Sequence, residues 1–236
     1  MRDIKEEFRK LGIIITDKMS EQFNLYYEML IEKNKVMNLT AITDYDDVVI
    51  KHFIDSAAII KVIDSFENIS IIDVGTGAGF PGIVIKILFP SVSAVLLDSL
   101  NKRVNFLKDV IRELKLDNIT AVHGRAEDIA HKSEYREKFD IATARAVTNM
   151  SVLAEYCLPF VKNDGHFVAY KSSDCDEEVK SAGKAIITLG GNDPELYKFK
   201  LPDTEIDRCF VSIRKVKKSP ILYPRKAGLP SKEPIS

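Results

Sequence analysis

The chain has few of the residues that build disulfides, metal sites or membrane spans. Its 236 residues include no tryptophan, four histidines and three scattered cysteines, Cys157, Cys175 and Cys209. No C-x-x-C pair occurs, so the sequence predicts neither a disulfide framework nor a structural zinc. No apolar run approaches the roughly 18 residues that a membrane-spanning helix needs. The charged N-terminus also lacks the apolar core of a signal peptide.

Neither sign of charge dominates the sequence. Lys and Arg number 34 and Asp and Glu number 35, which gives a formal net charge of −1. The net charge therefore gives no long-range electrostatic attraction for nucleic acid, and a nucleic-acid-binding surface would have to be a local basic patch. Without a secretion signal, this composition predicts a cytoplasmic globular protein. The length suits one large domain or a domain with an appendage.

The most informative stretch is residues 69–82, which change from an apolar run to a cluster of glycines. Ile69–Val74 predicts a buried strand, and Ile83–Phe89 predicts a helix that stops at Pro90. Between them lie four glycines, Gly75, Gly77, Gly79 and Gly82. Glycine lets the backbone approach a ligand closely, and a helix start presents free N–H groups. This strand, turn and helix therefore predict a binding crevice.

The glycine turn fits two sequence patterns, each typical of a different ligand. Residues 77–82 fit G-x-G-x-x-G, the dinucleotide pattern, whereas residues 75–79 fit G-x-G-x-G with Asp73 before them. The second frame is favoured because the strand ends at Val74, so Gly75 is the first residue of the turn. Asp73 also suits the cationic S-adenosylmethionine (AdoMet) better than the pyrophosphate of NAD. A turn built only for packing is the remaining alternative.

Acidic residues follow the next two predicted strands. Asp98 ends the strand at residues 92–98, about 20 residues after the glycine turn, where doubly wound sheets hold a ribose diol. A helix N-cap is the alternative role. Ala126 and Glu127 follow the strand at residues 118–123, where a backbone N–H and a carboxylate suit an adenine edge. A capped loop explains these two nearly as well.

The later patterns complete a seven-stranded sheet. Strands predicted at residues 139–147 and 165–171 alternate with helices, and residues 195–201 and 208–216 then follow without a helix between them. This predicts an α/β fold with a doubly wound, mostly parallel sheet and an antiparallel edge. Arg145 ends the fourth strand, where a buried charge would need a partner.

Three regions are expected along the chain. Residues 1–65 predict a helical N-terminal cap, with Ser20 as an N-cap and His52 as a satisfied polar group. This cap serves either packing or substrate positioning. Residues 66–218 form the main domain. Residues 219–236 are a basic, proline-rich tail that should form no helix; it is either solvated or an arm that contacts phosphates.

Several motifs occur together in one order along nearly the whole chain. They are residues 38–42, Gly75–Gly82, Leu97–Leu100 with Lys102 and Arg103, Arg125–Glu127, Arg145–Val147 and Pro224–Gly228. Together they resemble the glucose-inhibited division protein B family, AdoMet-dependent methyltransferases that modify a guanine N7 in small-subunit (16S) ribosomal RNA. The resemblance implies a class I methyltransferase sheet whose cofactor is held by Gly75, Phe80, Ala126, Glu127 and Arg145. Thr76 and Ser172 depart from the usual serine and glycine, and Ser172 leaves the role of Lys171 less settled.

The resemblance also implies which residues bind the cofactor and which contact RNA. Guanine N7 carries a lone pair, so no catalytic base is expected, and no metal. Gly75, Gly77, Gly79 and Phe80 should shape the cofactor pocket, while Arg145 serves the methionine carboxylate or RNA. Contacts to phosphates of 16S ribosomal RNA or of the small-subunit particle are expected from Lys102, Arg103, Lys171, Arg225 and Lys226. A monomer is expected. A methyltransferase of a small molecule or protein and a dinucleotide-dependent oxidoreductase remain the alternatives.

Overall fold

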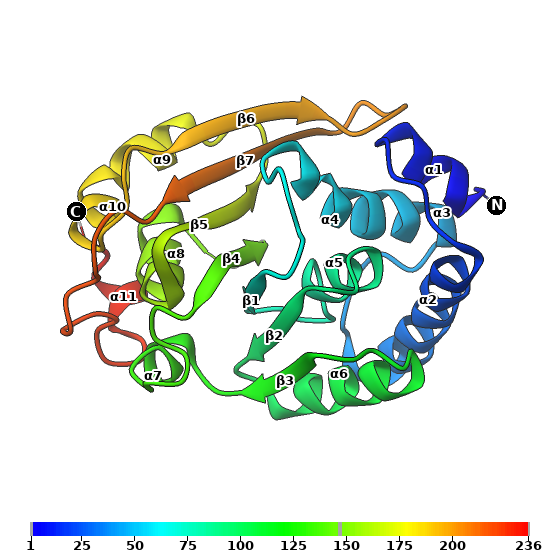
Figure 1. Cartoon of the computed structure of the whole chain (residues 1–236), viewed down its shortest axis with the longest axis horizontal. Coiled ribbons are helices and arrows are strands. Elements are labelled where there is room, and N and C mark those ends of the chain that lie inside the picture. The colour runs from blue at the N-terminus through cyan, green and yellow to red at the C-terminus, as the bar shows by residue number, and fades with distance from the viewer. Residues whose placement is uncertain (1, 146–147, 236) are drawn as a thin grey trace.

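The fold is built on one seven-stranded sheet (Figure 1). The computed structural model describes residues 2–145 and 148–235, so the predicted end of the fourth strand at 146–147 lies outside the described residues. The strand order is β3-β2-β1-β4-β5-β7-β6, with β1 to β5 parallel and β7 antiparallel to both its neighbours. The predicted sheet with its antiparallel edge is confirmed. The strands are β1 (Ser70–Val74), β2 (Ser93–Asp98), β3 (Ile119–His123), β4 (Phe139–Arg145), β5 (Val161–Lys171), β6 (Glu195–Lys200) and β7 (Asp207–Arg214).

Helices cover both faces of the sheet (Figure 1). One face carries α1 (Ile4–Lys10), α2 (Asp17–Met37), α3 (Tyr45–Val48), η1 (Val49–Ile54), α4 (Asp55–Ala57), η2 (Ala58–Lys61), α5 (Gly82–Leu88) and α6 (Asn101–Glu113). The other face carries α7 (Ala126–Ile129), α8 (Met150–Cys157), η3 (Leu158–Phe160), α9 (Asp176–Ser181) and α10 (Gly183–Thr188). Each face has its own apolar core because successive side chains of a strand point to opposite sides. Ile71 therefore packs in one core and Ile72 in the other.

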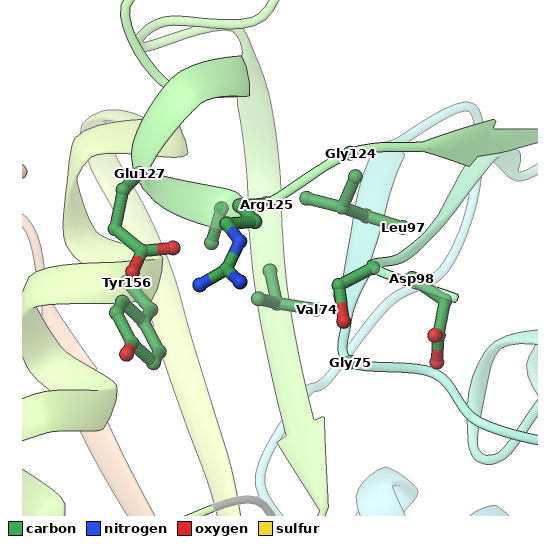
Figure 2. A pocket seen from close by; sticks show the side chains of 10 residues that line it. Val74, Gly75, Leu97, Asp98, Gly124, Arg125, Glu127 and Tyr156 are labelled. Carbon is green, nitrogen blue, oxygen red and sulfur yellow. The ribbon is translucent and has the colours of Figure 1, made fainter. Parts of the chain in front are cut away.

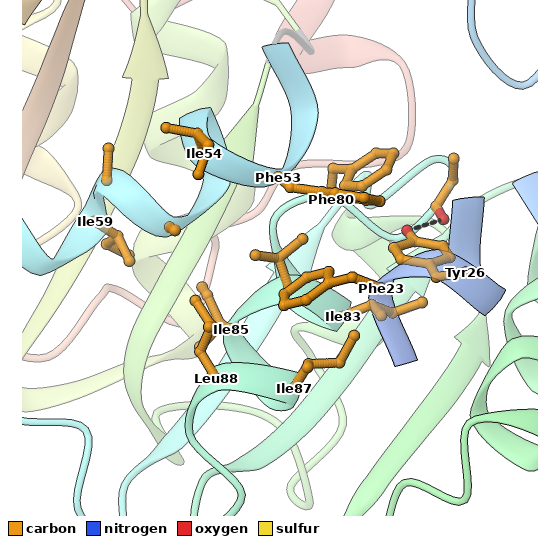
Figure 3. Packing of buried hydrophobic residues seen from close by; sticks show 14 of the residues in the cluster. Phe23, Tyr26, Phe53, Ile54, Ile59, Phe80, Ile83, Ile85, Ile87 and Leu88 are labelled. Carbon is orange, nitrogen blue, oxygen red and sulfur yellow. Dashed lines mark hydrogen bonds between the residues drawn. The ribbon is translucent and has the colours of Figure 1, made fainter. Parts of the chain in front are cut away.

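The N-terminal helices share the first of these cores with the sheet. Phe23 of α2 packs against Phe53, with ring centroids 5.0 Å apart, and the cluster continues to Phe80 and Ile83 (Figure 3). The Tyr26 hydroxyl donates a hydrogen bond of 2.7 Å to the carbonyl of Ala78 in the glycine turn. The extension therefore packs directly on the predicted binding turn.

The long helix α2 begins earlier than predicted. Its N-cap is Thr16, whose hydroxyl accepts a hydrogen bond from the Met19 N–H. The predicted cap Ser20 is wrong, because it lies inside the first turns of the helix. A threonine hydroxyl satisfies the free N–H groups of a helix start as serine does.

A π-helical turn interrupts the helical segment at residues 45–61 of the predicted cap. The segment η1 (Val49–Ile54) is π-helical and lies between α3 and α4. Val49, Phe53 and Ile54 point into the core, whereas Lys51 and His52 line a cavity. Such turns are rare and often occur at functional sites.

The C-terminal tail packs against the second face of the sheet. The guanidinium of Arg136 donates to the carbonyls of Ser219 (3.0 Å) and Tyr223 (2.8 Å). A short helix, α11 (Leu229–Lys232), follows, so the expectation that the tail forms no helix is wrong. Pro230 lies in its first turn, where a missing N–H donor costs nothing. Within residues 2–145 and 148–235, no helix combines the length and apolarity needed to cross a membrane.

Lys215 fastens the tail to the sheet and gives a stability test. Its side chain is fully buried, and Nζ donates to the Leu158 carbonyl (2.6 Å) and the Ser219 hydroxyl (2.8 Å). Burial lowers the pKa of Lys215 to about 8. Lys215→Ala leaves these buried acceptors unpaired, so urea denaturation should show a loss of about 3 kcal/mol in the free energy of unfolding. The exposed control Lys218→Ala should change it by less than about 0.5 kcal/mol; equal losses would contradict this role.

Candidate functional site

Asp73, at the end of β1, is fully buried beneath the glycine turn. Its Oδ2 accepts hydrogen bonds from the Thr76 hydroxyl (2.7 Å) and the Gly82 N–H (2.8 Å), and its Oδ1 accepts one from the Thr143 hydroxyl (3.3 Å). Burial raises the pKa of Asp73 to about 6, against the opposing effect of these hydrogen bonds. The prediction that Asp73 faces a cationic ligand is wrong, because its oxygens are used to brace the turn from inside.

The turn above Asp73 needs glycine for its backbone shape. Gly75, Gly77 and Gly79 have φ values of 71°, 62° and 110°, in the left-handed region that other residues rarely adopt. A Cβ on Gly79 would also lie 2.5 Å from Cδ1 of Ile83. The turn therefore exposes backbone rather than side chains at the carboxyl end of β1.

Asp98, at the end of β2, holds the turn from the other side. Its Oδ2 accepts a hydrogen bond from the Gly77 N–H (2.9 Å), and its Oδ1 accepts one from the Leu100 N–H (2.8 Å). Arg103 lies 3.5 Å from Oδ2. The alternative role as a helix N-cap is wrong, because the N-cap of α6 is Leu100 and no side chain caps that helix. The ribose role of Asp98 stays a prediction.

A cavity opens where β1, β2 and β3 end (Figure 2). Glu127 and Tyr156 lie at one end of it and Gly75 and Asp98 at the other, with Arg125 between them. Two acidic acceptors at opposite ends fit an adenosine, which has hydroxyls on its sugar and an amine on its base. We call this the first cavity; it is lined by Val74, Gly75, Leu97, Asp98, Ser99, Gly124, Arg125, Ala126, Glu127 and Tyr156.

The tail contacts Glu127, at one end of the first cavity. Glu127 is buried, and its Oε1 accepts a hydrogen bond of 2.9 Å from the Gly228 N–H. Nearby, the fully buried carboxylate of Glu155 accepts hydrogen bonds from Nε (2.9 Å), Nη2 (2.7 Å) and the backbone N–H (2.7 Å) of Arg225. We call these two contacts the tail clasp. They give Arg225 a structural partner, and its contact with an RNA phosphate stays a prediction.

Arg145, at the end of β4, lies in a second cavity. Its Nη1 contacts Oδ2 of Asp55 (3.0 Å), and its guanidinium lies 5.0 Å from the ring centroid of Phe80. The partner expected for this buried charge thus comes from the N-terminal extension. Neither Arg145 nor Phe80 lines the first cavity, and the cofactor contact that the resemblance implies for them stays a prediction. The second cavity is lined by Lys51, His52, Asp55, Arg145, Tyr170, Lys171, Ser172 and Arg208.

His52 joins the extension to both Arg145 and Phe80. Its Nδ1 accepts a hydrogen bond of 3.1 Å from Nη2 of Arg145, because a guanidinium can only donate. Nδ1 also lies 3.1 Å from the carbonyl of Lys51, and Nε2 lies 2.9 Å from the Thr40 hydroxyl. The ring stacks on Phe80, with centroids 4.5 Å apart. Burial, and then the charge of Arg145, lowers the pKa of His52 to about 3, so the ring is neutral.

The residues predicted to contact RNA lie in separate places. Lys102 and Arg103 begin α6, beside Asp98 of the first cavity. Lys226 is exposed on the tail, next to Arg225 in the clasp. Lys171 lies in the second cavity. Among the described residues, no group of three or more His, Cys, Asp or Glu could hold a metal ion.

The roles of several residues of the site could not be predicted from the sequence. Asp55 and Glu155 lie within helical patterns, where an acidic residue usually faces solvent, yet each is buried and pairs with a partly buried arginine. Arg208 lies in the alternating pattern of β7, between β5 and the edge strand β6, and also contacts Asp55, at 2.7 Å. Tyr156 is an ordinary helix residue until the fold brings it to Glu127. No local signal distinguishes such partners: Asp55 lies 90 and 153 residues from its two arginines, and Glu155 lies 70 residues from Arg225.

The sequence has close relatives among characterised families. A family model described as GidB, rRNA small subunit methyltransferase G, matches residues 19–206. Ribosomal RNA small subunit methyltransferase G of Lachnoclostridium phytofermentans is 50% identical over 227 residues, covering 96% of this chain and 94% of that protein. The protein of the same name from Desulforamulus reducens is 49% identical over 233 residues, covering 99% and 97%. The one from Bacillus subtilis is 48% identical over 224 residues, covering 95% and 94%.

Solved structures with similar folds share little sequence similarity with this chain. A SAM-dependent O-methyltransferase from Thermotoga maritima has a TM-score of 0.52 at 15% identity, covering 81% of this chain and 73% of that chain. TYW2 of M. jannaschii, solved in complex with AdoMet, has a TM-score of 0.51 at 15% identity, covering 64% and 71%. At this identity the likeness concerns the fold alone.

The fold is that of a class I AdoMet-dependent methyltransferase, with an N-terminal helical extension. The chain belongs to the GidB family of ribosomal RNA small-subunit methyltransferases. The predicted family and the predicted enzyme class are therefore confirmed. Membership of this family also decides against the dinucleotide-dependent oxidoreductase.

The tail clasp should support the first cavity. Arg225→Ala leaves the buried carboxylate of Glu155 unpaired, so thermal and urea denaturation should show a loss of about 3 kcal/mol. The freed tail should also weaken AdoMet binding, because Gly228 no longer fixes Glu127; calorimetry measures the dissociation constant. Lys226→Ala is the matched control and should leave both values unchanged. Equal behaviour of the two variants would contradict the clasp.

His52 should make the fold sensitive to acid. Its folded pKa of about 3 lies below the ordinary value of 6.5, so the unfolded chain binds an extra proton between these two pH values. The stability from neutral His52 is complete above pH 6.5 and falls by up to about 1.4 kcal/mol per unit as the pH drops toward 3. Denaturation of His52→Gln between pH 7 and 4 should show a shallower decline than the parent. The exposed control His123→Gln should keep the parental slope, and a parental slope for both variants would exclude His52.

Proposed function

We propose that this chain transfers the methyl group of AdoMet to N7 of a guanine in 16S ribosomal RNA. The proposal is carried by the first cavity, which offers acidic acceptors at both ends beside a glycine turn, in a chain of this family. Methylation of a small molecule or protein is the alternative, and the basic residues beside both cavities favour RNA.

The residues of the first cavity fit the adenosine part of AdoMet. Asp98 would accept hydrogen bonds from the ribose hydroxyls, and Ala126 and Glu127 would meet the adenine edge. Gly75 and Gly77 would let the backbone approach the methionine part. When bound, AdoMet supplies a methyl group on a cationic sulfur.

The chemistry needs position rather than a base. Guanine N7 provides the electron pair of the new N–C bond, and the pair of the C–S bond leaves with sulfur, so no proton moves. The chain would contribute by holding N7, carbon and sulfur in line and by excluding water from the cationic sulfur. The turn fixed by Asp73 and Asp98 supplies that rigidity. No catalytic residue is therefore assigned.

The remaining expectations stay predictions. Lys102, Arg103 and Lys226 would contact RNA phosphates around the first cavity. The monomeric state, the cytoplasmic location, the absence of a metal and the division into cap, main domain and tail belong to the same proposal. Whether free RNA or the assembled particle is the better substrate follows from the experiment below.

The proposal is tested by mapping the modified base. Purified protein and radiolabelled AdoMet are incubated with unmodified 16S RNA or with small-subunit particles. Borohydride reduction and aniline cleavage then reveal 7-methylguanine. One cleavage site that depends on the protein is expected. Label on another base, on protein or on no macromolecule would overturn the proposal.

Asp98 tests the cofactor assignment. Asp98→Asn keeps the size of the side chain and one acceptor oxygen but loses the charge. Calorimetry should show AdoMet binding weakened about tenfold or more, because charge-assisted hydrogen bonds to the ribose are lost. Asp109→Ala, on the outer side of α6, is the control and should bind as the parent does. An unchanged dissociation constant for Asp98→Asn would remove the ribose role.

A further inference from the structure

The second cavity is lined by more positive than negative groups. Its volume is about 350 Å³, within the range of pockets that hold small ligands. Four basic side chains line it, and Asp55 is the only acid in the lining of the described cavity. Asp47 and Glu178 pair with two of the lysines from outside that lining. The basic residues are Lys51, Arg145, Lys171 and Arg208.

Asp55 orients the two arginines rather than facing a ligand. It is only 4% exposed, and its two oxygens lie 3.0 Å from Nη1 of Arg145 and 2.7 Å from Nε of Arg208. Among the contacts of the described residues, Nη2 of Arg208 and Nε of Arg145 have no acceptor. Fixed guanidiniums with spare donors suit a ligand rich in acceptor oxygens, such as a phosphate or a purine carbonyl.

The cations follow the edge of the sheet outward from the glycine turn. Thr143 of β4 lies opposite Asp73 of the parallel strand β1. Arg145 and Gly75 each come two residues later, so both lie at the same edge of the sheet. Lys171 ends β5, the next strand, and Arg208 lies on β7 beyond it. With strands about 4.8 Å apart, the row begins next to the cofactor turn and extends over roughly 10 Å.

The N-terminal extension forms the opposite wall of the second cavity. Lys51 and His52 lie on the π-helical turn η1, and Asp55 follows it. His52 stacks on Phe80 of the glycine turn, and the same aromatic cluster continues to Tyr26 (Figure 3). The extension is therefore placed to position a substrate, which is the second of the two roles open to it from the sequence.

We propose that the second cavity binds the methyl-accepting guanosine of the RNA. Arg145 would donate to O6 of the guanine, and Lys171 and Arg208 would hold its phosphate. O6 lies beside N7 on the same edge of the base, so a donor next to the glycine turn leaves N7 directed at the methyl group. A nucleotide removed from its stack can enter such a pocket. This inference rests on the proposed function and assigns the place of its substrate.

Two variants test the proposal without touching the first cavity. Ser172→Trp adds bulk at an exposed residue of the cavity wall. Arg208→Ala removes the outer cation and leaves Asp55 paired with Arg145. Each should raise the KM for RNA about tenfold or more and leave the calorimetric dissociation constant of AdoMet unchanged. Binding of guanosine 5′-monophosphate, followed by NMR line broadening in the presence of S-adenosylhomocysteine, should also be lost.

Matched controls separate this inference from the proposed function. Ser133→Trp and Arg214→Ala place the same changes at exposed positions away from the cavity and should keep the parental KM. Parental KM and nucleotide binding in both Ser172→Trp and Arg208→Ala would overturn the guanosine assignment and leave the function intact. A parent protein that binds AdoMet but methylates no guanine would instead overturn the proposed function.

Discussion

The buried carboxylate of Asp73 fixes the turn between the two cavities. It ties the start of α5 to the end of β1 through Gly82 and reaches β4 through Thr143. Removing such a charge from water is costly, and its pKa of about 6 shows that cost. The hydrogen bonds offset it and hold the glycine turn rigid. On one side Gly75 opens the first cavity, and on the other Phe80 supports the second.

The buried ion pairs attach the two ends of the chain to this turn. Asp55 of the extension meets Arg145 and Arg208, and Glu155 meets Arg225 of the tail. Buried pairs add little net stability over apolar packing, but breaking one by removing a partner is severe. They fix geometry, since they hold the extension in the wall of the second cavity and the tail close to Glu127 of the first. The terminal segments are thus part of the site.

The sequence predicted the sheet, its antiparallel edge and the glycine turn, because short-range periodicity and glycine spacing determine them. It also predicted that Asp98, Ala126 and Glu127 would meet Gly75, since parallel strands bring their carboxyl ends to one edge. It failed for Asp73 and did not reveal Glu155 as the partner of Arg225, because these contacts depend on tertiary packing. The same holds for the second cavity, which joins a helix turn near residue 52 to strands more than 90 residues later.

The central claim is that one rigid turn joins a cofactor cavity and an acceptor cavity into a single methyl-transfer site. A crystal structure of the full chain with S-adenosylhomocysteine and guanosine 5′-monophosphate tests this directly. The account predicts ribose hydroxyls about 3 Å from Asp98, adenine beside Glu127, and guanine against Arg145 with N7 directed at the sulfur. A nucleoside outside the first cavity, or a guanine bound away from Arg145, would contradict it.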